Sequence, residues 1–464
     1  MDFFFKPRGV AIIGASANPI KGGHFILKNV INGFKGGIYP VNPGYTEIEG
    51  LTCYPSVSEV PDPLDLAIIF VPGPAVPAVV RECAERGIKG VMIESAGFAE
   101  IGDGGIHLQK QLVAIRTETG IRIWGPNCMG LVDAVNQQVF SFVLPSIWEG
   151  GLITGDVSLV VQSGMLSAGF LIDIMSHATM GISKACSLGN KVDVDECDIL
   201  EYLIDDPETG VIGLYLESIQ DGRRFVELSR RSSKPIVVLR GGKSRKGARA
   251  ALSHTASLAG NNAVVGGALA QVGVVEANDF KQMMDLCRTL SDYPAIPTSA
   301  AGRVAILTMS GAAGILSSDF IEPLGLMVAD LSRDTVRALM QIYPKWMPVS
   351  NPVDLWPAVE LNGRKKVYQT AFQAVCTDPN VDAVLFHSFI GGIASEADIT
   401  DLVEIARSAG KPLFGWVMGK RDEVHQFRLH TRKLGVPVFP ELYRAVECMA
   451  AVFKRSRYIQ RRGN

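Results

Sequence analysis

The sequence has no hydrophobic run long enough to cross a membrane, because polar residues interrupt every apolar stretch well before about 18 residues. It also has no excess of one charge: the formal net charge is -2, so no broad basic field favours nucleic acid or anionic lipid. The N-terminal stretch MDFFFKPRGVAIIGAS lacks the basic start and small-residue cleavage site of a signal peptide. Eight cysteines occur singly, without a C-x-x-C pair, so neither a zinc knuckle nor a disulfide framework is indicated. We expect a reduced, cytoplasmic protein without a bound metal.

What the sequence does contain is a large apolar fraction, 47% of residues, with 20% charged. This composition favours well-buried cores, and a length of 464 residues suggests about three domains. Near the N-terminus, short β-branched strands alternate with helix-length segments such as Val76–Arg86. The strand candidates are residues 9–16, 36–43, 65–72, 90–95 and 121–127. This order predicts a doubly wound, Rossmann-like α/β domain over residues 1–133.

The remainder of the chain looks like two copies of one α/β unit. GDVSLVVQSGMLSAGFLID (155–173) aligns without gaps with GRVAILTMSGAAGILSSDF (302–320), at an offset of 147. Further matches follow in the same order: GVIGLYLESI (210–219) with VDAVLFHSFI (381–390), and KPIVVLRGGK (234–243) with KPLFGWVMGK (411–420). We therefore predict duplicated domains at residues 151–290 and 301–464, with linkers at 134–150 and 289–301.

Turn-like sequences follow the predicted strands of the first domain. Gly14-Ala-Ser16 comes after the first strand, and VNP (41–43), FVPGP (70–74), ESAGF (94–98) and GPNCMG (125–130) follow the others. Ligands of open α/β sheets bind outside the carboxyl ends of the strands, so a long ligand laid across these loops is predicted. The dinucleotide pattern G-x-G-x-x-G is absent, which weakens an interpretation as an NAD-dependent dehydrogenase.

Two pairs of residues end equivalent strands of the two copies and begin equivalent helices. They are Ser163-Gly164 and Ser310-Gly311. The N–H groups at a helix start attract anions, so each pair is a candidate phosphate cradle. The alternative is that each serine only caps its helix.

His254 lies in a loop of small residues, GARAALSHTASLAG (247–260), although the chain has only seven histidines. A lone histidine is usually structural. The repeat changes this expectation, because the third domain has no counterpart of this loop and carries Ser388 where the second domain has Glu217. A carboxylate near an imidazole fixes its tautomer and leaves the other nitrogen free as a nucleophile. We therefore predict a mobile histidine that accepts a phosphoryl group and is supported by Glu217.

Together these segments resemble the alpha subunit of the ADP-forming acyl-CoA synthetases, which belong to the succinyl-CoA synthetase superfamily. The resemblance covers essentially the whole chain. It rests on AIIGAS (11–16) with Lys21-Gly22, YPVNP (39–43), ESAGF (94–98), GPNCMG (125–130), VQSG (161–164), SLGN (187–190) with Asp193, SHTASLAG (253–260) and SNPVDL (350–355).

The resemblance implies a CoA-binding Rossmann-like domain followed by two flavodoxin-like domains. It implies that His254 is the phosphorylated histidine, supported by Glu217. It implies CoA binding by Gly14, Ser16, Lys21, Val41, Asn42, Val71, Pro72, Ser95, Gly97 and Asn127. The family reaction converts acyl-CoA, ADP and phosphate into an acid, ATP and CoA through an acyl phosphate. It further implies a separate ATP-grasp beta subunit that binds ADP or ATP with Mg2+ in an α2β2 assembly.

The chain departs from the family pattern at Ala256, where glycine is usual, and at Met165, where a small residue is usual. Met165 indicates either an acyl group other than acetyl or a different packing. Two alternatives with the same fold are a CoA-dependent acyl or carbamoyl transferase and a CoA-binding sensor. The His254 loop and Glu217 favour the synthetase.

Overall fold

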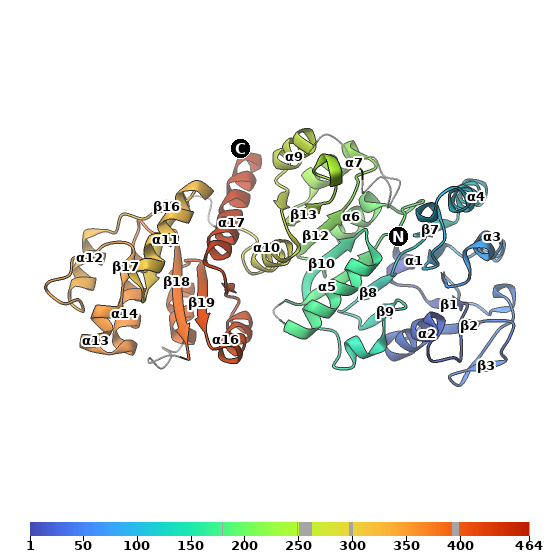
Figure 1. The fold of residues 1–464 in the computed structure, drawn as a ribbon, viewed down its shortest axis with the longest axis horizontal. Coiled ribbons are helices and arrows are strands. Elements are labelled where there is room, and N and C mark those ends of the chain that lie inside the picture. The colour runs from blue at the N-terminus through green and yellow to red at the C-terminus, as the bar shows by residue number, and fades with distance from the viewer. Residues whose placement is uncertain (179, 248, 250–261, 297–299, 392–398, 464) are drawn as a thin grey trace. The chain divides into compact units, whose positions relative to one another are not determined.

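The computed structural model describes residues 1–178, 180–247, 249, 262–296, 300–391 and 399–463 (Figure 1). It forms two compact units, Met1–Met283 and Met284–Asn464. Three large sheets carry the fold, and each is built around parallel strands. The prediction of an α/β protein is therefore confirmed.

The first sheet has the strand order β2-β1-β5-β6-β7, and all of its strands are parallel. Its strands are β1 (Gly9–Ile13), β2 (Gly37–Val41), β5 (Leu66–Ile69), β6 (Gly90–Ile93) and β7 (Arg122–Trp124). The connections contain α2 (Gly22–Gly33), α3 (Val76–Glu85) and α4 (Asp103–Thr119), while α1 (Asp2–Phe5) precedes the sheet and β3 (Glu47–Ile48) pairs with β4 (Leu51–Thr52). Each predicted strand of this domain is confirmed. These strands were predictable because each is a short β-branched or apolar run that ends in a turn.

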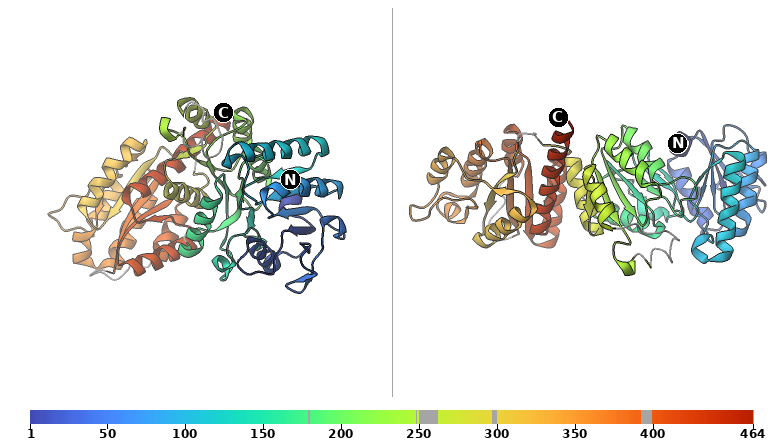
Figure 2. Two further views of the ribbon diagram at one scale, coloured as in Figure 1. Left: turned by 45° about the vertical axis from the view of Figure 1, so that its right-hand side comes forward. Right: turned by 90° about the horizontal axis from the view of Figure 1, so that it is seen from above.

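The second sheet has the order β14-β13-β12-β10-β11-β8-β9. Its parallel strands are β10 (Thr154–Val161), β11 (Ile182–Ser187), β12 (Val211–Leu216), β13 (Ile236–Arg240) and β14 (Val275–Ala277). Its helices are α5 (Gly164–His177), α6 (Glu196–Asp205), α7 (Gly222–Arg231) and α9 (Asn262–Gln271). The strands β10, β11 and β12 are largely buried, and two further views show helices on both sides of this sheet (Figure 2).

The predicted linker at 134–150 is wrong in part. β8 (Leu131–Asp133) and β9 (Gln138–Phe140) form an antiparallel pair that extends the second sheet through β11. A 3-10 turn, Pro145–Trp148, follows β9. β9 has only three residues and depends on pairing with a partner strand, so no local pattern marks it.

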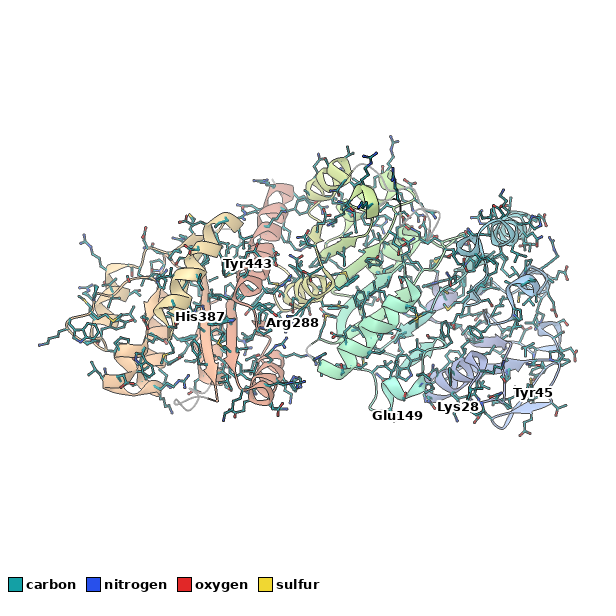
Figure 3. All side chains as sticks on the ribbon, viewed as in Figure 1. Lys28, Tyr45, Glu149, Arg288, His387 and Tyr443 are labelled. Carbon is teal, nitrogen blue, oxygen red and sulfur yellow. The ribbon has the colours of Figure 1, made fainter. Side chains whose placement is uncertain are left out.

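The third sheet has the order β16-β15-β18-β19-β20, with β17 paired to β15. Its strands are β15 (Arg303–Thr308), β16 (Met327–Val328), β17 (Val353–Asp354), β18 (Ala383–Ile390), β19 (Leu413–Gly419) and β20 (Val438–Phe439). The helices of this part of the chain are α10 (Phe280–Asp292), α11 (Gly311–Ile321), α12 (Arg333–Met340), α13 (Trp356–Asn362), α14 (Arg364–Thr377), α15 (Ile399–Ser408), α16 (Arg421–Lys433) and α17 (Leu442–Gly463). His387, labelled in Figure 3, lies in β18.

The duplication predicted from sequence is visible in the strand orders. β10 lies between β11 and β12, and β15 lies between β16 and β18, so the first parallel strand of each sheet is an interior strand, as in flavodoxin-like sheets. β12 matches β18, and β13 matches β19, as the aligned sequences require. The helices that follow β10 and β15 begin at Gly164 and Gly311, immediately after the aligned serines.

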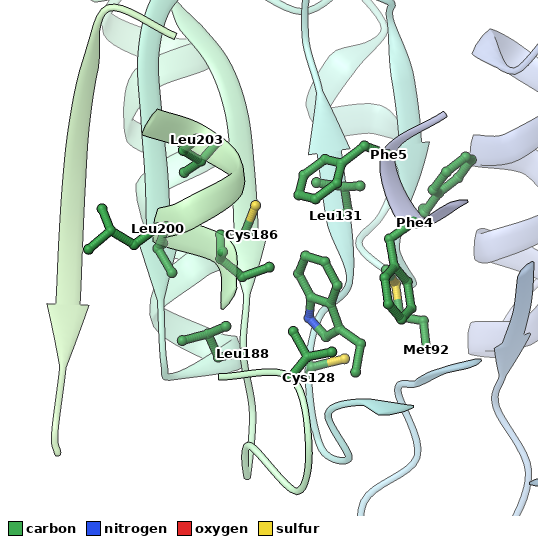
Figure 4. Packing of buried hydrophobic residues seen from close by; sticks show 14 of the residues in the cluster. Phe4, Phe5, Met92, Cys128, Leu131, Cys186, Leu188, Leu200 and Leu203 are labelled. Atoms are coloured by element: carbon green, nitrogen blue, oxygen red, sulfur yellow. The ribbon is translucent and has the colours of Figure 1, made fainter. Parts of the chain in front are cut away.

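One hydrophobic core joins the first two sheets within the unit Met1–Met283. Phe4 and Phe5 from α1 contact the Trp124 ring at centroid distances of 5.3 and 5.8 Å. The indole of Trp124 donates a hydrogen bond to the carbonyl oxygen of Ser187 in β11, at 2.7 Å. Figure 4 shows the continuation of this cluster. Burial of these large rings stabilises the two sheets as one body.

Candidate functional site

The carboxyl ends of four strands in the first sheet lie level with one another. Ile13 is opposite both Val41 and Ile69, and Ile69 is opposite Ile93. The residues that follow these strands therefore meet at one edge of the sheet, as the sequence predicted. They include Gly14, Asn42, Phe70 and Glu94.

A cavity of about 870 Å³ lies at this edge, within the unit Met1–Met283. The lining residues come from the first sheet and from the domain that follows it. Predicted site residues in the lining are Gly14, Ser16, Lys21, Asn42, Val71, Pro72, Ser95, Asn127, Ser163, Gly164 and Glu217. The cavity thus combines most of the predicted CoA residues with one predicted phosphate cradle and the predicted supporting carboxylate.

Other predicted residues are not in this lining. Val41 is buried in β2, and the N–H of Gly97 donates to Glu100 Oε1 at 2.7 Å. Ser310 and Gly311 belong to the unit Met284–Asn464. His254 lies outside the described residues.

The turn after β1 requires glycine because backbone groups approach it closely. Gly14 has φ +94°, and a Cβ there would lie 2.2 Å from the carbonyl oxygen of Phe70. A Cβ on Gly23, in the first turn of α2, would lie 2.0 Å from the Gly14 carbonyl oxygen. Asn42 Nδ2 donates to the Ala15 carbonyl oxygen at 2.8 Å. The start of α2 is therefore held against the cavity, where its N–H groups favour an anionic ligand.

Hydrogen bonds connect the remaining strand-end loops to one another and to the second domain. Ser95 Oγ accepts a hydrogen bond from the Val71 N–H at 3.0 Å. Asn127 Nδ2 donates to Asn190 Oδ1 at 3.4 Å, and Asn190 Nδ2 donates to Glu100 Oε2 at 2.7 Å. The Asn127–Asn190 and Asn190–Glu100 contacts connect the strand-end loops of the first sheet with the loop after β11. That loop contributes Gly189 and Asn190 to the cavity lining.

The starts of the two equivalent helices differ. Ser310 Oγ accepts a hydrogen bond from the Ala313 N–H, so this serine caps α11. Ser163 makes no capping hydrogen bond to the described residues of α5. The first N–H groups of α5, beside the cavity, therefore lack the side-chain cap that α11 has. Capping explains the serine of α11 and does not explain the serine of α5.

Glu217 immediately follows β12, and its backbone N–H donates to Gln162 Oε1 at 2.9 Å. Burial raises the pKa of Tyr215, and the charge of Glu217 with its side-chain hydrogen bond to Tyr215 raises it further. A Cβ built on Gly241 would lie 3.5 Å from Glu217 Cγ. The segment that leads from β13 towards residues 247–260 therefore begins beside the Glu217 side chain.

The sequence did not indicate several residues of the lining: Glu94, Met129, Phe142 and Asn190. All but Phe142 lie inside the quoted motifs, so attention to every polar residue there would have found Glu94 and Asn190. Glu94 is 3% exposed. Burial raises its pKa well above the usual range, although the Phe142 N–H donates to Oε2 at 3.0 Å.

No group of three or more His, Cys, Asp or Glu side chains among the described residues has the arrangement of a metal site. No helix in the described part of the chain combines the length and hydropathy needed to span a bilayer.

Two family models match successive parts of the chain. Residues 8–134 match a CoA binding domain, and residues 154–290 match a succinyl-CoA ligase like flavodoxin domain.

Curated relatives match almost the whole of this chain. The chain is 37% identical over 461 residues to the ADP-forming acetate–CoA ligase II of Archaeoglobus fulgidus, covering 99% of this chain and 67% of that protein. It is 36% identical over 451 residues to the alpha subunit of the ADP-forming acetate–CoA ligase II of Pyrococcus furiosus, covering 95% and 94%. A solved acetyl-coenzyme A synthetase 1 of Ca. Korarchaeum cryptofilum, in complex with phosphate and ADP, superimposes with a TM-score of 0.87 at 30% identity, covering 99% and 98%.

Proposed function

Because this chain belongs to the family of ADP-forming acetate–CoA ligases and matches their alpha subunits, we propose that it carries the CoA-binding and phosphohistidine steps of an acyl-CoA synthetase. The reaction interconverts acyl-CoA, ADP and phosphate with a carboxylic acid, ATP and CoA. The observation that supports this assignment is the single cavity lined both by the first sheet's strand-end loops and by the domain that follows. It is lined by eight predicted CoA residues together with Ser163, Gly164 and Glu217.

In this proposal CoA lies across the strand-end loops of residues 1–133. The start of α2 and Lys21 receive its phosphates, and Ser95 and Asn127 contact the ligand farther along the edge. Val41 and Gly97 act indirectly, by shaping the loops after β2 and β6.

Phosphate binds at the uncapped start of α5, against Ser163 and Gly164. An oxygen of phosphate attacks the thioester carbonyl, the C–S bond breaks, and CoA leaves as the thiol after taking a proton. The acyl phosphate formed in this way then transfers its phosphoryl group to a ring nitrogen of His254, and the carboxylate leaves. Glu217 accepts a hydrogen bond from the opposite ring nitrogen and stabilises the charge on the imidazole.

The phosphoryl group then passes from His254 to ADP. We assign ADP, ATP and Mg2+ to an ATP-grasp beta subunit in an α2β2 assembly. The matched Pyrococcus furiosus chain is an alpha subunit, which supports a separate partner chain. Residues 151–290 carry the histidine loop, and residues 301–464 supply the second helix start at Ser310 and Gly311. A cytoplasmic location fits this chemistry and the eight free, buried cysteines.

Substitutions at the two predicted catalytic residues test this function. In the complex with the beta subunit, His254→Asn should abolish ATP-dependent thioester formation and keep CoA affinity within about twofold, because the histidine acts only on the phosphoryl group. Glu217→Gln should slow phosphorylation by about ten- to a hundredfold, because the imidazole loses a charged partner. His107→Asn, an exposed substitution on α4, is the control. Full activity of His254→Asn, or an unchanged phosphorylation rate in Glu217→Gln, would remove that residue from the mechanism.

A further inference from the structure

Gln162 is a buried amide that lies just before the start of α5 and that the steps above do not use. The residue is 3% exposed and belongs to the cavity lining. Its Oε1 atom accepts hydrogen bonds from the Glu217 N–H at 2.9 Å and from the Ser218 N–H at 3.4 Å. Because a backbone N–H can only donate, these contacts identify the oxygen of the amide and turn Nε2 away from the end of β12.

The amide nitrogen of Gln162 is left for a ligand. Nε2 donates no hydrogen bond to a described residue, yet it is not one of their fully buried unpaired polar atoms, so it keeps accessible surface. Since the residue lines the cavity, that surface faces the cavity. A buried carboxamide with a paired oxygen and an open nitrogen indicates a hydrogen-bond acceptor on the nitrogen side.

The backbone of Gln162 fixes this amide beside the helix start. Its N–H donates to the Tyr215 carbonyl oxygen at 3.0 Å, and its carbonyl oxygen accepts from the Gly189 N–H at 3.2 Å. These contacts join the end of β10 to β12 and to the loop after β11. Ser163 and Gly164 come next, at the helix start that lacks a side-chain cap from Ser163. Nε2 therefore adds a side-chain donor to N–H groups that attract an anion.

The second copy of this strand and helix lacks both features. The residue at the offset of 147 from Gln162 is Met309, whose side chain has no N–H donor. There Ser310 caps α11 by accepting from the Ala313 N–H. The donor amide and the uncapped helix start thus occur together in one copy, and the other copy has neither. This pairing indicates one ligand that uses both.

We infer that Gln162 is a phosphate-binding residue, whose Nε2 donates to an oxygen of the phosphate at the start of α5 while Oε1 holds the backbone of Glu217. This inference rests on the proposed function. Only one phosphate oxygen bonds to the acyl carbon, so the oxygen held by Nε2 is unchanged when the acyl phosphate forms. A neutral amide stabilises the charged oxygens without taking up a proton. The phosphates of CoA are assigned to Lys21 and the start of α2, so the free phosphate is the ligand expected here.

The test measures ATP formation by the complex with the beta subunit from ADP, varied phosphate and three thioesters: acetyl-, butyryl- and phenylacetyl-CoA. Gln162→Met removes donor and acceptor, whereas Gln162→Glu keeps an acceptor oxygen and replaces the donor with a charged oxygen. We expect the phosphate KM to rise about tenfold in Gln162→Met, because a hydrogen bond to a charged group is lost. It should rise further in Gln162→Glu, because the carboxylate repels phosphate. CoA affinity in isothermal titration should stay within about twofold, because the CoA phosphates bind at α2.

Gln282→Glu is the matched control. Gln282 is 4% exposed and its Oε1 atom also accepts a backbone hydrogen bond, from the Asn278 N–H, but it lies in α10 and outside the cavity lining. This variant should keep the wild-type phosphate KM. A larger rise in Gln162→Met than in Gln162→Glu would show that only the Oε1 contacts matter and would overturn the inference. A loss of CoA affinity as large as the change in phosphate KM would overturn it as well.

A crystal structure of the wild-type complex with phosphate needs no variant, so poor folding of the variants does not prevent a decision. We expect a phosphate oxygen within hydrogen-bonding distance of Gln162 Nε2. A start of α5 that stays empty at saturating phosphate, or that holds phosphate without this contact, would contradict the inference. An active wild type whose phosphate KM is unchanged by both substitutions overturns the inference alone. If the wild type makes no ATP from any of the three thioesters, the proposed function fails, and the crystal structure still decides on the phosphate contact.

Discussion

At the scale of single residues, Gly14 offers a direct test of the turn that holds α2 against the cavity. Gly14→Ala places a Cβ 2.2 Å from the carbonyl oxygen of Phe70, so the loop or the start of α2 must move. We expect CoA affinity to fall at least about tenfold, because the N–H groups at the start of α2 no longer point at the phosphates of the ligand. Isothermal titration with CoA measures this change.

Gly50→Ala is the matched control for this substitution. Gly50 also has positive φ, +74°, but no atom of the described residues lies within 4 Å of a Cβ built there. Its substitution should cost about 1 kcal/mol of stability through backbone strain and leave CoA affinity unchanged. Equal effects of the two substitutions on CoA affinity would contradict the role given to the Gly14 turn.

The buried side chain of His387 should make the stability of β18 depend on pH. Burial lowers its pKa to about 4, and its ring contacts the hydroxyl groups of Ser317 and Thr308 at 3.1 and 2.9 Å. The unfolded chain binds a proton at this histidine near pH 6.5, whereas the folded chain does not until about pH 4. The contribution of neutral His387 to the free energy of unfolding is therefore fully present above pH 6.5 and is lost as the pH falls towards 4. It amounts to about 3 kcal/mol.

Hydrogen exchange of the β18 amides between pH 7 and pH 4 measures this loss. His387→Gln does not titrate, so the local stability of β18 in that variant should depend less on pH. An equally steep pH dependence in the two proteins would show that other groups are responsible.

At the scale of elements, the starts of α5 and α11 differ although their sequences align. Ser310→Ala should destabilise the unit Met284–Asn464 by about 1 kcal/mol, because Ser310 caps α11. Ser163→Ala removes no cap hydrogen bond to the described residues, so it should leave stability almost unchanged and weaken phosphate binding. Urea denaturation and the phosphate KM distinguish these effects. The reverse result, with stability lost at Ser163, would return both serines to a capping role.

The elements themselves were largely predictable from sequence, and the exceptions have a physical cause. The strands β1, β5 and β6 are runs of β-branched or apolar residues with turns at their ends, so local pattern sufficed. β9 was missed because three residues carry little pattern and its position depends on pairing with β8. Phe142 follows β9 and was missed with it.

The candidate site was predictable where a motif marks a strand end, and less so elsewhere. Gly14, Asn42 and Ser95 follow strands whose ends lie level, and all three line the cavity. Glu94 lies inside a quoted motif, yet its burial depends on the packing of residues 128–130 and 142, which are distant in the sequence. A carboxylate at the end of a strand gives no local sign that its environment is apolar.

At the scale of the whole molecule, the shared core explains why the cavity combines two kinds of residue. The cluster around Trp124 continues from α1 through β11 to α6, so the first two sheets form one body. The strand-end loops of the first sheet therefore have a fixed position beside the start of α5 and Glu217. In the proposed reaction, this arrangement holds the thioester of CoA next to the phosphate that attacks it.

The central claim is that this chain takes a phosphoryl group on His254, and mass spectrometry of the chain tests it most directly. The chain is incubated with acyl-CoA and phosphate in the presence of its beta subunit, and its peptides are kept at alkaline pH. We predict an acid-labile phosphoryl group on the peptide that contains His254, absent in His254→Asn and reduced in Glu217→Gln. A folded chain that binds CoA but carries no phosphoryl group under these conditions would contradict the account.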